Sequence, residues 1–326
     1  MWPLLQLERQ VFGSWFSWLT AKDHHDSRAQ KMESLLETVD RELSTGSEGP
    51  FFLGADVSLV DLMFTPFLER MAASLPYYEG FCTRYERFPA LLRWYEAMDA
   101  RTHTYGGIKS DYYTHCKNLP SQIGRCWPSQ VVEGEHMRAE IDGFVPAAAR
   151  TAIHEPMLPL DTGVASRDAA RRAVMNRDKL VRFAARGAVV AKDDRGPRAV
   201  SAPLADPGMR SEEVILPAVD AALCCALADM LLSSSPSSSP WPSPQLLLVP
   251  AMPQPGTTNA DADADADTDA DADTDADADT DADAIVATRV AASLVYLRDR
   301  SGVPRDMTPH AAQQMRQSIA AYVRRR

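Results

Sequence analysis

The sequence predicts an all-α protein, with a helical bundle over its first 120 residues. Apolar residues recur there at three- and four-residue steps, as on one face of an amphipathic helix. Helix-start signals precede several of these stretches, and no segment in this part is a convincing strand. Four or five helices without strands can bury their apolar faces only against one another, which predicts a bundle.

Two helices are expected first. The chain enters a helical pattern at once, with apolar residues from Leu4 to Leu19 at helical spacing. The second helix is predicted over 27–43, where Met32, Leu36 and Val39 form part of one apolar stripe. The polar and glycine-containing residues 44–49 end it. His24 and His25, between the two helices, are expected to be a polar pair without partners.

The best-marked helix follows a tight aromatic loop. Ser58 is the predicted N-cap, and Asp61 can reach back to the Ser58 backbone N–H in an acidic form of the capping box. Val57 and Leu62 are placed to form a hydrophobic staple. The residues that follow are apolar on nearly every side, which predicts a buried helix, although Pro66 lies inside it.

Weaker patterns follow. Residues 76–80 are expected to break the central helix, Pro89 to occupy the first position of the next one, and 110–117 to form a short helical piece. A helix capped by Ser166 is predicted over 166–186, a short strand or extended linker over 189–191, and another helix over 217–232. Order is predicted to return at 285–298 and at 308–324, where Thr308 caps and Pro309 takes the first helical position.

Charge and cysteine content exclude several classes of function. The net charge is −11, but residues 260–283 carry twelve aspartates, so the rest of the chain is at +1 and no nucleic-acid partner is expected. No apolar run reaches about 18 residues, so no membrane span is expected. The aspartate repeat lacks the glycine and glutamate of a calcium loop, and the five cysteines show no metal spacing. No metal site is predicted.

The sequence therefore divides into five parts. They are a helical domain (1–125), an irregular linker (126–165), a helical extension (166–232), a disordered Ser/Pro and Asp/Ala insertion (233–284) and C-terminal helices (285–326).

The loop and helix start GPFFLGADVSLVD (residues 49–61) resemble the helical C-terminal domain of glutathione S-transferases. In that family a similar loop leads through a capping box into the central buried helix, and a proline is common at about the place of Pro66. The resemblance covers residues 1–120. Residues 293–307, SLVYLRDRSGVPRDM, look like the C-terminal tail of a plant, algal and cyanobacterial subgroup of transferases.

The resemblance implies a transferase C-terminal-type bundle that uses glutathione as co-substrate and contains no cofactor of its own. In the family a thioredoxin-like N-terminal domain binds glutathione and activates its thiol. No such segment is visible in the sequence, so no catalytic residue is assigned. By resemblance, five aromatic residues are candidates for the wall of a pocket for a small hydrophobic electrophile, with the protein core or a dimer contact as the alternative: Phe12, Trp15, Trp18, Tyr112 and Tyr113.

The expected function is that of a glutathione S-transferase-like protein, from a truncated gene or an incomplete gene model, whose partner is a second copy or the missing thioredoxin-like domain. A non-catalytic module for protein–protein assembly is the alternative, and an unrelated helical protein is a third reading. The cytoplasm is the expected location, with a plastid as the alternative.

Overall fold

The computed structural model describes residues 2–22, 25–45, 49–123, 126–145, 149–151, 155, 161–190, 213–233 and 275–325. Within these residues the fold is all-α, as predicted. They contain no β-strand, only an isolated bridge between Phe51 and Gly54. The chain forms two compact units. The first includes Met1–Ala169 and Asp299–Gln317, and the second includes Ala170–Asp194, Met209–Arg298 and Ser318–Arg326.

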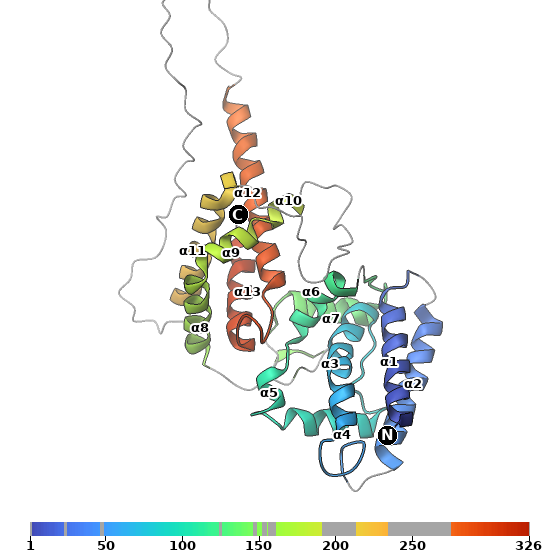
Figure 1. Cartoon of the computed structure of the whole chain (residues 1–326). Coiled ribbons are helices and arrows are strands. Elements are labelled where there is room, and N and C mark those ends of the chain that lie inside the picture. Colours follow the sequence, from blue (N-terminus) through green and yellow to red (C-terminus); the bar gives the residue numbers. More distant parts are fainter. Residues whose placement is uncertain are drawn as a thin grey trace, which may run out of the picture. The chain divides into compact units, whose positions relative to one another are not determined.

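Seven helices precede residue 145 in the described ranges. They are α1 (Trp2–Leu19), α2 (His25–Thr45), α3 (Leu59–Glu79), α4 (Pro89–Asp99), α5 (Tyr105–Ile108), α6 (Tyr112–Ile123) and α7 (Val132–Asp142). Helix α3 is central: it packs against α1, α6 and α7, while α2 packs against α1 and α4 (Figure 1). Trp15, Trp18 and Trp94 are among the largest side chains that this core buries.

The remaining helices are α8 (Thr162–Met175), α9 (Arg177–Ala184), α10 (Gly187–Val190), α11 (Leu216–Ser233), α12 (Asp275–Arg300) and α13 (Pro309–Arg324). A 3-10 turn at Glu213–Ile215 leads into α11. The predicted starts at Pro89, and at Thr308 with Pro309, are confirmed. The Thr308 hydroxyl accepts the Ala311 N–H at 3.4 Å.

Helix α3 continues through Pro76, so the predicted break at 76–80 is wrong. The helix ends only at Gly80, which adopts the left-handed conformation with φ 68°. The Gly80 N–H donates to the Pro76 carbonyl and the Phe81 N–H to the Leu75 carbonyl, which satisfies the last turn. Pro76 has no backbone N–H and so cannot donate the usual helix hydrogen bond. The burial of Tyr77 and Tyr78, whose hydroxyls both have hydrogen-bond partners, compensates for this loss.

The first turn of α3 is less buried than predicted. Leu59 is 60% exposed and Leu62 56% exposed, although Val60, Phe64 and Leu68 are fully buried. This turn therefore has more apolar residues than the core buries. The exposed face of Leu62 belongs to the pocket described below.

Several other predictions were wrong. The predicted irregular linker 126–165 contains α7 and the beginning of α8. Ser166 is buried inside α8 and is not a cap, and the predicted helix 166–186 is interrupted at Asn176. Gly187–Val190 is helical where a strand or linker was expected, and the short helix predicted at 110–117 runs from Tyr112 to Ile123. In each case local signals were weak and contacts distant in sequence decide the boundary.

The predicted disordered insertion begins at Ser233, which closes α11, and residues 234–274 lie outside the described residues. Its last part was predicted wrongly, because Asp275 begins α12 and the helix runs through the end of the aspartate repeat. Alanine is the best helix former, and aspartates in a first turn interact favourably with the helix dipole.

The second unit is organised around α11, which packs against α9. Seven residues of α11, from Ala218 to Met230, are buried. Asp220 binds the Arg177 guanidinium through both carboxylate oxygens, and Asp229 binds Arg325. The segment Glu213–Ser233 is long and apolar enough to cross a membrane by length and composition, a test that a packed core helix also passes.

Candidate functional site

The first unit contains a pocket of about 560 Å³. Its lining comes from the N-terminal half of α3, the end of α4, the residues around α5, helix α6 and the segment that joins α12 to α13. Its apolar lining consists of Val57, Leu62, Pro66, Met98, Ile108, Val303 and Pro304. Its polar lining consists of Thr65, Glu69, Arg70, Arg101, Thr104, Tyr105, Ser110, Thr114, His115, Asn118 and Gln122.

The apolar part of the lining explains the exposed leucine at the start of α3. Leu62 and Val57, which the sequence pairs as a hydrophobic staple, both line the pocket. Ile108, at the end of α5, is 71% exposed and lines it as well. An open apolar wall of this kind is available to a ligand without any rearrangement of the core.

A buried acid–imidazole pair lies in the polar part of the lining. Glu69 Oε1 lies 2.8 Å from His115 Nε2 and accepts the Ser110 backbone N–H at 2.7 Å, while the Tyr105 hydroxyl donates to Oε2 at 3.3 Å. Both Glu69 and His115 are more than nine-tenths buried.

The same contacts set the ionisation of Glu69. Burial alone would raise its pKa, but the hydrogen bond and charge of His115, with the Ser110 N–H and the Lys109 charge, outweigh that effect. The pKa of Glu69 therefore lies below its usual value. Burial, aided by the Glu69 charge, raises the pKa of the Tyr105 hydroxyl, so Tyr105 remains a neutral donor.

Two guanidinium groups also line the pocket. Arg70 is partly buried and donates to the Pro66 carbonyl at 2.6 Å, one turn earlier on α3. Arg101 is exposed and lies 5.0 Å from the centre of the Phe51 ring. Neither forms an ion pair in the described structure, so both leave their charge available to a ligand.

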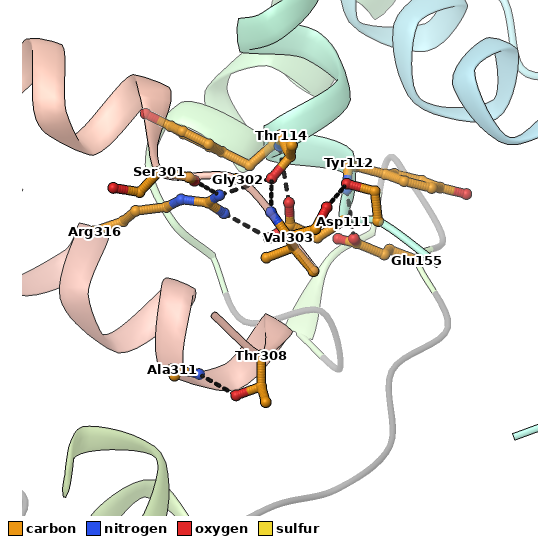
Figure 2. A network of polar contacts seen from close by, with 12 residues as sticks. Asp111, Tyr112, Thr114, Glu155, Ser301, Gly302, Val303, Thr308, Ala311 and Arg316 are labelled. Atoms are coloured by element: carbon orange, nitrogen blue, oxygen red, sulfur yellow. Dashed lines mark hydrogen bonds and ion pairs between the residues drawn. The ribbon is translucent and has the colours of Figure 1, made fainter. Parts of the chain in front are cut away.

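One wall of the pocket comes from the far end of the chain, and Arg316 of α13 holds it in place (Figure 2). The Arg316 guanidinium donates to Asp111 at 2.5 Å, to the Thr114 hydroxyl at 2.8 Å and to the Ser301 carbonyl at 2.6 Å. We call this set of contacts the Arg316 clasp. Arg316 is only 2% exposed, which makes the clasp a buried charge network.

The clasp is continued by backbone contacts on both sides. The Thr114 hydroxyl accepts the Val303 N–H at 3.1 Å, and the Ser110 hydroxyl donates to the Val303 carbonyl at 2.5 Å. These bonds place Val303 and Pro304 against α6, where both line the pocket. Residues 299–317 thus belong to the first unit, although the sequence assigned them to separate C-terminal helices.

Asp111 has two roles in this network. It precedes α6 and accepts the Thr114 N–H at 2.8 Å, as an N-cap does, while its second oxygen accepts from Arg316. Burial would raise its pKa, but the Arg316 charge and the Thr114 hydrogen bonds outweigh it, so the pKa of Asp111 is lowered.

Trp15 and Trp18 of α1 are buried in the core, Phe12 is partly buried, and none of the three lines this pocket. The Trp15 indole N–H donates to the Ser74 hydroxyl at 2.9 Å, and the Trp18 ring packs edge-on against Phe81. The partly buried Phe12 ring lies 4.8 Å from the Phe67 ring. Their role in binding an electrophile stays a prediction.

Tyr112 and Tyr113 are also buried outside this pocket. The Tyr113 hydroxyl donates to Asp299 at 2.5 Å, and its ring lies 4.5 Å from the Arg316 guanidinium. The Tyr112 hydroxyl is buried without a hydrogen-bond partner among the described residues. Burial raises the pKa of Tyr112, so this phenol stays protonated. Their predicted part in the pocket wall is likewise untested.

The capping box of Ser58 and Asp61 is confirmed, with both reciprocal contacts present. Asp61 Oδ2 accepts the Ser58 N–H at 2.8 Å and the Ser58 hydroxyl at 2.6 Å. No group of three or more potential metal-ligating side chains occurs in the described ranges.

Sequence reasoning missed the residues that the pocket brings together. A signal existed for Glu69, which is a charged residue in a helix predicted to be buried, and such residues are almost always paired. For His115, Arg101 and Val303 we find no comparable local signal, since their partners lie far away in the sequence.

The fold defines the class of protein, an all-α bundle around one central capped helix with a ligand-sized pocket. In a comparison with known families, residues 22–97 match the family model for the C-terminal domain of glutathione S-transferase. The chain thus contains a glutathione S-transferase C-terminal domain, and the match spans α2, α3 with its capping box, and most of α4. No curated protein and no solved structure matches the chain.

Proposed function

We propose that this chain is a glutathione S-transferase-like protein whose helical domain binds a small hydrophobic electrophile in the pocket beside α3. The observation that supports this most is the pocket itself, whose volume of about 560 Å³ lies within the range of small-molecule sites. Leu62, Met98 and Ile108 offer apolar contact, and a few polar groups around Glu69 can orient a ligand.

The proposed reaction is attack of the glutathione thiolate on the bound electrophile. That step needs a group that lowers the thiol pKa, and a thioredoxin-like domain supplies it in the family. We propose that the helical domain contributes the electrophile site and dimer contacts, while a thioredoxin-like domain binds glutathione. The cysteines of the domain core cannot replace it, because burial raises the pKa of both Cys116 and Cys126.

Two leucines in the first turn of α3 allow a matched test. Leu59 and Leu62 are similarly exposed, but only Leu62 lines the pocket. The Leu62→Trp variant should reduce affinity for an apolar fluorescent probe at least about tenfold, because the larger ring fills the site, whereas Leu59→Trp should bind like the parent. Equal binding by both variants would show that the probe binds elsewhere.

Assembly through the helical domain is the second candidate function. Leu53 and Leu59 are each more than half exposed, in the loop and the first turn that Asp61 joins. Exposed apolar residues close together in sequence are candidates for a protein contact. Sedimentation of the parent and of a Leu53→Asp, Leu59→Asp double variant tests this: a dimer that the double variant loses, together with no probe binding, would favour assembly over ligand binding.

A further inference from the structure

The residues between α4 and α6 form a surface lobe, residues 100–108, that is closed at its neck. Asp99 ends α4, and its carboxylate pairs with the Lys109 ammonium at 2.7 Å, so the lobe begins and ends at one place. The second oxygen of Asp99 accepts from Arg84 at 2.6 Å. Both partners at the neck are largely buried, since the side chains of Asp99 and Lys109 are 14% and 11% exposed. A compact surface loop whose ends lie together is often functional.

Little holds the rest of the lobe to the domain. Within 100–108 seven residues are exposed, and only Tyr105 is buried. The Tyr105 hydroxyl donates to Glu69 at 3.3 Å, which is a long hydrogen bond. If that bond opens, Glu69 keeps its shorter contacts with His115 and with the Ser110 N–H. A segment with so few buried contacts opens at a low cost in free energy.

The lobe has hydrogen bonds of its own and forms one wall of the pocket. The Gly106 N–H donates to the Arg101 carbonyl at 3.1 Å, and the Gly107 N–H donates to the Thr104 carbonyl at 3.2 Å. Four residues of the lobe line the pocket: Arg101, Thr104, Tyr105 and Ile108. A movement of the lobe therefore changes how open the pocket is.

Two adjacent glycines lie in the part of the lobe that forms α5. Neither Gly106 nor Gly107 adopts a positive φ. A Cβ atom at Gly106 would meet no atom closer than 3.8 Å, and one at Gly107 would meet nothing within 4 Å. Alanine would therefore fit both positions and would favour a helix more than glycine does. The observed conformation does not require glycine, whereas a change of backbone conformation at this place is easier with it.

We propose that the lobe is a lid that closes over a ligand in the pocket, with Gly106 and Gly107 as its hinge. This inference rests on the proposed function, because it concerns access to the same pocket. Ile108 follows the hinge and is 71% exposed in this structure, so closure would bury its side chain against the ligand. The neck stays in place during closure. A ligand under a closed lid leaves only when the lid opens, so the lid slows its release.

The double variant Gly106→Ala, Gly107→Ala tests the hinge. Alanine keeps the observed conformation and resists a change, so a bound ligand stays uncovered. With uncharged N-phenylnaphthylamine as the probe, stopped-flow fluorescence on the full chain should show release at least about threefold faster than from the parent, with association unchanged. Gly13→Ala is the matched control, at a glycine of α1 outside the pocket whose Cβ would also meet nothing within 4 Å. It should change neither rate.

Hydrogen exchange on the parent chain checks closure without any variant. The exposed amides of Gly106 and Gly107 should exchange at least about fivefold more slowly when the probe is bound, whereas exchange in α1 should not change. Release from the double variant at the parental rate, or exchange that the probe does not slow, would overturn the lid and leave the proposed function intact, because the probe still binds. A parent chain that does not bind the probe would overturn both.

Discussion

Asp61 accepts four hydrogen bonds although its side chain is completely buried. Besides the backbone and hydroxyl of Ser58, it accepts the Phe52 N–H at 3.1 Å and the Trp94 indole N–H at 2.9 Å. One carboxylate thus joins the aromatic loop, the start of α3 and helix α4. Its role extends well beyond the capping box that the sequence predicts.

Replacement of Asp61 by alanine should therefore cost more than the loss of a cap. Four donors would lose their partner, those of Phe52 and Trp94 in fully buried bonds, and we expect a destabilisation of about 3–5 kcal/mol. Ser58→Ala should cost about 0.5–2 kcal/mol, and the nearby exposed Asp56→Ala within about 0.5 kcal/mol. Urea unfolding monitored by circular dichroism measures all three. An Asp61→Ala variant no less stable than Ser58→Ala would contradict the conclusion that Asp61 joins the loop, α3 and α4.

Glu79 is a second buried carboxyl group, and its burial changes its own ionisation. Its Oε2 lies 2.9 Å from His25 Nδ1, so the expectation that His24 and His25 lack partners was wrong for His25. Burial raises the pKa of Glu79 to about 7, and the His25 contact opposes this only in part. The folded state thus holds a proton that the unfolded chain releases at lower pH.

This difference predicts a pH dependence of stability. The contribution of Glu79 is fully present below its unfolded pKa of 4.5 and is lost as pH rises to about 7. A Glu79→Gln variant should gain stability relative to the parent over that interval, because its amide has no proton to lose. Unfolding at several pH values tests it, with Glu37→Gln, at an exposed residue paired with Arg87, as the control. A constant difference between parent and Glu79→Gln would exclude the effect.

At the scale of elements, α6 and α13 depend on one another. The N-terminal residues of α6 and the segment between α12 and α13 share the Arg316 clasp, which bridges 205 residues of sequence (Figure 2). The pocket wall at Val303 and Pro304 therefore depends on a buried ion pair.

The Arg316→Ala variant should destabilise the first unit by about 3–5 kcal/mol, because it leaves Asp111 buried without its cation. It should also weaken ligand binding, because Val303 and Pro304 lose their anchor. An Asp111→Asn, Arg316→Met double variant should recover much of the stability, since it removes both charges. Thermal unfolding and the probe titration measure these effects. A single variant that binds and unfolds like the parent would show that the wall holds without the clasp.

At the scale of the whole molecule, the expected activity of the 326-residue chain by itself is low. We predict glutathione conjugation with a chloronitrobenzene substrate near the solution rate, since about a few per cent of a thiol with an ordinary pKa is ionised at pH 7. Tyr113 is engaged by Asp299, and Tyr112 is only 1% exposed, so neither hydroxyl is placed to donate to the thiol of a bound glutathione. The assay needs an active transferase as positive control. Robust turnover that Tyr112→Phe or Tyr113→Phe abolishes would contradict the prediction.

Local signals in the sequence were sufficient for three helix starts and for the fold class, although the start predicted at Ser166 was wrong. Ser58 with Asp61, Pro89, and Thr308 with Pro309 are confirmed where they were predicted. Each depends on contacts within one helical turn, which the sequence states directly. The family resemblance was carried by the same short stretch and is confirmed over residues 22–97.

Only the tertiary structure decided the extent of the helices and the content of the site. Helix α3 passes through Pro76 because Tyr77 and Tyr78 are buried against distant partners, Asp142 and the Cys116 carbonyl. The Glu69–His115 pair and the Arg316–Asp111 pair join residues that are 46 and 205 positions apart. Periodicity reports which face of a helix is apolar but not which other helix covers it, so partners at such separations follow only from the packed structure.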